Sequence, residues 1–141
     1  PVKKGIVMNH TTEGLLAKPC TGDVETVWKR LLDTLKALNV PLFATVDHAA
    51  NARSAGLFMP ETRVAFFGKP AVGTHLMLER PEVAIELPLR MMVTEVPGEG
   101  TVLFLPDILW MAHRYGIDPQ LESLRKILGF MSLLSDKVCG Q

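Results

Sequence analysis

The strongest chemical signal in the sequence is the segment from Phe66 to Thr74, which reads FFGKPAVGT. It predicts a strand that ends at Gly68 and a helix that opens at Pro70, and such a junction leaves backbone N–H groups at the positive end of the helix dipole. Lys69 adds a charge and Thr74 adds a hydroxyl, so the segment favours binding of a carboxylate or a phosphate. The alternative is a tight turn that needs glycine only for its backbone conformation. The order of residues differs from that of a Walker phosphate loop.

Asp47 and His48 form the second candidate, at the end of a predicted strand over residues 42–47. Many α/β folds place their sites at strand ends. A histidine there can act as a general acid or base, or as the partner of a bound anion. The alternative is a structural one, in which His48 only caps the helix that follows.

Other chemistries have little support in the sequence. The histidines are scattered, without the spacing of a metal site, and stand at His10, His48, His75 and His113. We therefore expect no metal and no cofactor. Cys20 and Cys139 form no C-x-x-C pair and meet only if the fold brings the two ends of the chain together. We expect reduced, unreactive thiols.

Composition narrows the classes of function further. The 141 residues carry 15 basic and 15 acidic side chains, so the formal net charge of +0 argues against a general nucleic-acid binder. Residues 1–5 lack the apolar core of a signal peptide, and polar residues and a proline interrupt the longest apolar stretch, so we expect a cytoplasmic protein without a membrane span. Hydrophobic residues make up 48% of the chain before its eleven glycines are counted. This surplus favours a ligand pocket or a homodimer interface.

The periodicity of apolar residues predicts one domain over residues 1–141. Residues 11–22 are expected to form a loop, and residues 6–8 an edge strand. Helices are expected over 24–38, 48–55, 70–78, 107–116 and 119–138, and strands over 42–47, 63–67, 83–87, 89–96 and 101–105. Strands and helices interleave and then give way to a hairpin, which favours an α+β two-layer sandwich. Its helices would cover one face of a mixed or antiparallel sheet.

Four short motifs stand in one order along the chain: VDHAA at 46–50, FFGKPAVGT at 66–74, ELPL at 86–89 and WMAHRYG at 110–116. Together they resemble the bacterial and archaeal domain of unknown function 302 family, over about residues 23–117 and more loosely over the final helix. Lys69 departs from the family pattern, in which an asparagine is common. The resemblance implies a compact α/β domain that dimerises, and it implies no known activity.

The interpretation that these observations favour is a homodimeric module that binds a small anionic or amphipathic ligand. Its site would comprise Asp47, His48, Gly68, Lys69, Gly73 and Thr74. One alternative is a small enzyme with His48 as general acid or base and Lys69 steadying a developing charge. The other is a purely structural or assembly protein, with the turn at Gly68 packed shut. The three differ in whether His48, Lys69 and Thr74 converge on an open pocket.

Overall fold

The computed structural model describes residues 12–140. The predicted strand at residues 6–8 lies outside this range. The elements follow in the order β1 (Leu15–Pro19), α1 (Val24–Ala37), β2 (Leu42–Asp47), α2 (His48–Ser54), β3 (Thr62–Phe67), α3 (Pro70–Glu79), the 3₁₀ helix η1 (Pro81–Glu86), β4 (Leu89–Val96), β5 (Gly100–Pro106), α4 (Ile108–Tyr115) and α5 (Glu122–Cys139).

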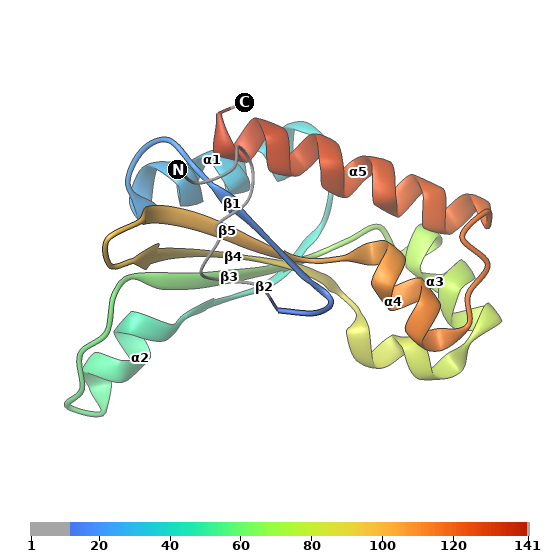
Figure 1. The fold of residues 1–141 in the computed structure, drawn as a ribbon, viewed down its shortest axis with the longest axis horizontal. Coiled ribbons are helices and arrows are strands. Elements are labelled where there is room, and N and C mark those ends of the chain that lie inside the picture. Colours follow the sequence, from blue (N-terminus) through green and yellow to red (C-terminus); the bar gives the residue numbers. More distant parts are fainter. Residues whose placement is uncertain (1–11, 141) are drawn as a thin grey trace.

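The five strands form one sheet in the order β1-β5-β4-β3-β2, and every neighbouring pair is antiparallel. The long helices α1 and α5 lie across one face of the sheet, while α2 and α3 lie at opposite ends of it (Figure 1). This arrangement confirms the predicted α+β class. The sequence left open whether the sheet is mixed or antiparallel, and the structure shows that it is antiparallel throughout.

The core lies between the sheet and the pair α1 and α5. Helix α1 begins where the Asp23 carboxylate accepts a hydrogen bond from the Thr26 amide at 2.8 Å, which satisfies one of the free donors of the first turn. Its apolar stripe is buried, with Leu31 fully enclosed. Helix α5 presents Leu124, Met131 and Val138 to the same core. Burying each such side chain stabilises the fold by about 1.5–3 kcal/mol relative to exposing it.

Three predicted elements differ from the structure. The predicted loop at 11–22 contains β1, which pairs with β5 through Leu16 and Leu105 and therefore depends on a partner far away in the sequence. The apolar run 83–87 is not a strand: residues 83–86 belong to η1, which begins at Pro81, and Leu87 caps its C-terminal end. A short apolar run does not by itself distinguish a strand from such a helix. Helix α5 begins at Glu122, because the Asp118 carboxylate caps a separate turn by accepting from the Gln120 amide at 2.9 Å.

The two cysteines correct a further prediction. Cys20, just after β1, and Cys139, the last residue of α5, form a disulfide with their Cα atoms 4.1 Å apart. The prediction of reduced thiols is therefore wrong, because the end of α5 returns to the end of β1. Two hydrogen bonds beside the disulfide also hold the end of α5 in place. Arg30 Nη1 donates to the Val138 carbonyl at 2.6 Å, and the Thr21 amide donates to the Cys139 carbonyl at 3.3 Å.

Among residues 12–140, none of the helices has the length and apolar character that crossing a membrane requires.

Candidate functional site

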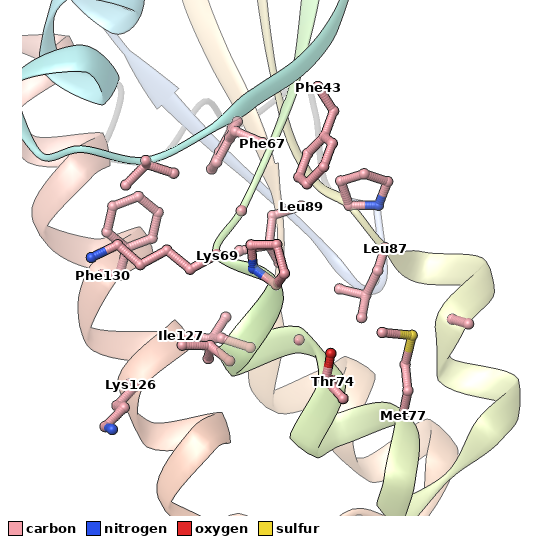
Figure 2. Close-up of a pocket in the computed structure, with 17 residues that line it drawn as sticks. Phe43, Phe67, Lys69, Thr74, Met77, Leu87, Leu89, Lys126, Ile127 and Phe130 are labelled. Atoms are coloured by element: carbon pink, nitrogen blue, oxygen red, sulfur yellow. The ribbon is translucent and has the colours of Figure 1, made fainter.

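A cavity of about 550 Å³ opens where β2 and β3 meet α3, η1 and α5 (Figure 2). Four of the predicted site residues line it, namely Gly68, Lys69, Gly73 and Thr74. Most of the remaining wall is hydrocarbon: Val40, Phe43, Phe67, Pro70, Val72, Met77, Ala84, Leu87, Pro88, Leu89, Ile127 and Phe130, with Lys126 at the side of α5.

The strand-to-helix junction shapes one wall of this cavity. Phe67, at the end of β3, is fully buried and packs edge-to-face against Phe130 of α5, with ring centroids 6.1 Å apart. The chain then turns through Gly68 and Lys69 into α3, where Pro70 takes the first helical position at no cost in hydrogen bonds. This much follows the prediction made from the segment at 66–74.

The backbone amides of the junction do not form the expected anion cradle. The Gly68 amide donates to the Pro41 carbonyl at 3.1 Å, and the Val72 and Gly73 amides both donate to the Lys69 carbonyl, at 3.0 and 3.1 Å. Pro70 has no N–H to offer. The prediction that these groups are unpaired is therefore wrong for Gly68, Val72 and Gly73. An anion therefore finds no free backbone donor at these three positions.

The charges on the cavity wall are all positive. Its charged lining residues are Lys69 and Lys126, and no aspartate, glutamate or histidine lines it within the described part of the chain. Lys69 is exposed, begins α3 without a side-chain cap and forms no ion pair with any residue from 12 to 140. The Lys126 ammonium lies 3.2 Å from the Glu122 carboxylate, in a pair whose side chains are 62% and 84% exposed. Such a pair contributes about 0–1 kcal/mol, so Lys126 remains accessible to another anion.

Asp47 and His48 do not belong to this site. In the β2–β3 ladder, Asp47 lies opposite Arg63 at one end, and Leu42 lies opposite Phe67 at the other end. The five residue-to-residue steps from Arg63 to Gly68 span roughly 17 Å at the rise of an antiparallel strand. The prediction that His48 lies beside Gly68–Thr74 is therefore wrong: in an antiparallel pair, successive strand ends fall at opposite edges of the sheet.

The contacts of Asp47 are those of a helix cap. One carboxylate oxygen accepts from the Ala50 amide at 2.9 Å, and the other lies 3.7 Å from Arg63 Nε. His48 is the first residue of α2, and its side chain is exposed. The cap that the structural alternative assigned to His48 is thus provided by Asp47, and His48 does not converge with Lys69 and Thr74.

Sequence reasoning missed a polar cluster that fixes η1 beside the cavity. The Tyr115 hydroxyl donates to the Glu86 carboxylate at 2.6 Å, and Arg114 lies 3.8 Å from the same carboxylate and 5.3 Å from the Tyr115 ring centroid. The pKa of Tyr115 is raised, first by this hydrogen bond to Glu86 and then by desolvation. The cluster ties α4 to η1, which carries Ala84 on the cavity wall. Its two halves lie far apart in sequence, so spacing gave no signal for it.

A second cavity, of about 500 Å³, lies between β1 and α5. Its lysine, Lys18, is already bonded to Asp136 and lies 3.4 Å from the Ser135 hydroxyl. Over residues 12–140, no group of three or more histidine, cysteine, aspartate or glutamate side chains is arranged to hold a metal ion. The cavity at Gly68–Thr74 is therefore the better candidate for a ligand.

Comparison with known proteins fits the fold. A crystal structure of an uncharacterised conserved DUF302 protein from Bacillus stearothermophilus superimposes with a TM-score of 0.77, over 91% of this chain and 99% of that one, at 18% identity. Two curated relatives from Brucella suis and Brucella abortus, each named fluoride-specific ion channel FluC 1, are 33% identical over 105 residues, or 74% of this chain. The matched region spans only 41% and 38% of those relatives. The family model described as domain of unknown function DUF302 matches residues 16–132. The chain therefore belongs to the DUF302 family.

Proposed function

We propose that this protein is a small-molecule-binding module whose ligand occupies the cavity at Gly68–Thr74. The observation that carries the proposal is the cavity itself, with a volume of about 550 Å³ and a wall of mostly hydrocarbon with few polar groups. Small-molecule sites in proteins typically have about 300–1,000 Å³ and this kind of lining. Apolar surface that a ligand covers there adds about 25 cal/mol per Å² to binding, before the entropic costs are subtracted.

The glycines of the junction argue against the structural alternative, in which the turn is packed shut. A side-chain carbon built on Gly68 would meet nothing within 4 Å, and one built on Gly73 would touch only Leu87, at 3.6 Å. Space is therefore free along the wall where a ligand would lie. The enzyme alternative depended on His48 standing beside Lys69, and the sheet register separates the two. We do not transfer channel activity from the Brucella relatives, because the match covers about two fifths of their length.

The test fills the cavity from a position that the fold tolerates. Ala84 and Ile85 are neighbours on η1, both are exposed, and only Ala84 lines the cavity. We expect Ala84→Trp to abolish binding of an uncharged apolar dye such as Nile red, while Ile85→Trp binds it as the wild type does. Equal dye binding by both variants, with both folded by circular dichroism, would refute the proposal.

The expected homodimer is also a proposal. Leu57, Phe58 and Met59 form an exposed apolar tip between α2 and β3, and Phe58 is 87% exposed. Exposed apolar clusters of this kind mark contact surfaces. We expect sedimentation analysis to show a dimer that Phe58→Ser weakens. The control variant Leu78→Ser, at an apolar position on α3 that is 75% exposed, should leave the dimer intact. A monomer at high protein concentration would rule the dimer out.

The disulfide bears on the compartment, for which we propose an alternative to the expected cytoplasm. Disulfides persist in oxidising compartments and are rare in the cytoplasm of most cells. The Cys20–Cys139 bond therefore supports an oxidising compartment rather than the cytoplasm that we expected from the sequence. Blocking thiols with an alkylating agent in intact cells, followed by mass spectrometry, should find both cysteines unmodified. Alkylated cysteines would restore the cytoplasmic interpretation.

A further inference from the structure

The two lysines of the cavity wall narrow the class of ligand. Lys69 lies at the start of α3, and Lys126 lies on α5 one helical turn before Phe130. Figure 2 shows the Lys69 side chain extending toward Phe130, so its ammonium lies on the α5 side of the cavity, where Lys126 also stands. The opposite side, around Met77 and Leu87, carries no charge. The cavity is thus electrically asymmetric, with its positive end at α5.

This asymmetry selects among ligands of equal size. An uncharged apolar molecule gains nothing from the lysines, and a cation is repelled by both. A molecule with an apolar body and one anionic head matches both halves, because its body covers the wall at Met77 and Leu87 while its head reaches the ammonium groups. The Thr74 hydroxyl lies beside Met77, on the side of the cavity away from the two ammonium groups, so it is not part of the site for the head (Figure 2).

We propose that the ligand is a medium-chain aliphatic monocarboxylate, held by its carboxylate at Lys69 and Lys126 and by its hydrocarbon chain over Met77 and Leu87. This inference rests on the proposed function and adds the charge and the orientation of the ligand. Lys69 is the stronger partner, because it has no ion pair within residues 12–140, whereas Lys126 is shared with Glu122.

The experiment compares octanoate, 1-octanol and octylammonium, which share one chain and differ in the charge of the head. Each is titrated as a competitor of Nile red. We expect octanoate to bind more tightly than octanol by about threefold to tenfold, for two exposed charge contacts, and octylammonium to bind most weakly. The preference for octanoate should shrink as salt is added, because salt screens exposed charges.

Substitutions assign the effect to the two lysines. Lys69→Gln should weaken octanoate binding about threefold to fivefold and leave octanol binding unchanged. Lys126→Gln should weaken it less. Lys137→Gln, which removes the same charge from an exposed position on α5 outside the cavity, should have no effect. Glu122→Gln should strengthen octanoate binding, because it releases Lys126 from its ion pair.

The outcomes separate this inference from the proposed function. If octanol and octanoate displace the dye equally well and the lysine variants behave like Lys137→Gln, the cavity binds apolar molecules without regard to charge and the inference is wrong. If no compound displaces the dye and Ala84→Trp binds it as the wild type does, the proposed function itself fails.

Discussion

The Gly68 amide donates a hydrogen bond to the carbonyl of Pro41, 3.1 Å away, across the end of the β2–β3 ladder. This bond holds the start of β2 against the strand-to-helix junction and places Phe43 on the cavity wall. It also removes from the site a donor that an anion would otherwise use. If a ligand binds here as proposed, apolar groups give its affinity and the two lysines give its charge preference.

A small inorganic anion should therefore bind poorly. Phosphate offers no hydrocarbon to the apolar wall, and three amides of the junction are already bonded within the protein. We expect the melting temperature to be the same in phosphate and in chloride at equal ionic strength. Octanoate should raise the melting temperature, because it binds only the native state. A phosphate-specific increase that Lys69→Gln abolishes would instead indicate an anion site at the junction.

Asp47 and His48 should affect stability without affecting ligand binding. Asp47→Ala removes the cap of α2 and leaves the Ala50 amide without its partner, so it should lower the free energy of unfolding by about 1 kcal/mol. His48→Ala changes an exposed side chain and should cost less. Octanoate affinity should stay at the wild-type value in both variants. A tenfold loss in His48→Ala would show that the two ends of the sheet are coupled.

Tyr115 should ionise at a higher pH than an ordinary tyrosine, because its hydroxyl donates to Glu86. It is the chain's single tyrosine, so ultraviolet absorbance of the phenolate reports its titration alone. Glu86→Gln should move the midpoint down, since the carboxylate is the main cause of the raised pKa. Arg114→Gln should move it up, since Arg114 opposes that effect. Identical midpoints in all three proteins would contradict the described cluster.

The same raised pKa sets the sign of a stability effect. The native state holds the Tyr115 proton to higher pH than the unfolded chain does, so this contribution is fully present below the ordinary pKa of 10.0 and is lost as pH rises through the folded pKa. Wild-type stability should therefore fall more steeply above pH 10 than that of Tyr115→Phe, in which the lysines still titrate but the phenol is absent. Parallel curves would show that Tyr115 does not contribute.

Loss of the disulfide should destabilise the whole domain. The bond joins residues 119 apart, and removing it restores conformational freedom to the unfolded chain. We expect the Cys20→Ser, Cys139→Ser double variant to unfold with about 2–5 kcal/mol less free energy than the oxidised wild type. A thiol reductant should lower wild-type stability to the same level and leave the double variant unaffected. Insensitivity of the wild type to the reductant would contradict the bond.

The elements that the sequence predicted correctly are those whose cap, apolar periodicity or turn lies within one short segment of the chain. Helix α1 has a cap at Asp23 and an uninterrupted apolar stripe, and the β4–β5 hairpin has its turn at Pro97–Gly100. Strand β1 was missed because its pairing with β5 is its main support, and η1 was missed because a short apolar run fits a strand equally well.

The candidate site divides in the same way. The junction from Gly68 to Thr74 is local and was found, whereas Phe43 and Phe130 come from elements that only tertiary packing brings together. His48 was placed wrongly for a physical reason: the rule that sites gather at strand ends applies to parallel strands, and β2 and β3 are antiparallel. The disulfide was missed because nothing local in sequence shows that α5 returns to β1.

The Cys20–Cys139 disulfide closes most of the chain into a covalent ring. Strand β1 lies outside this ring, directly before Cys20. A protease that cuts the exposed apolar tip at Leu57–Met59 would open this ring without releasing a fragment. The cleaved protein would migrate as one band on a non-reducing gel. Its two fragments would separate only after the disulfide is reduced. Molecules nicked in this way can remain folded, because each half stays tethered to the other.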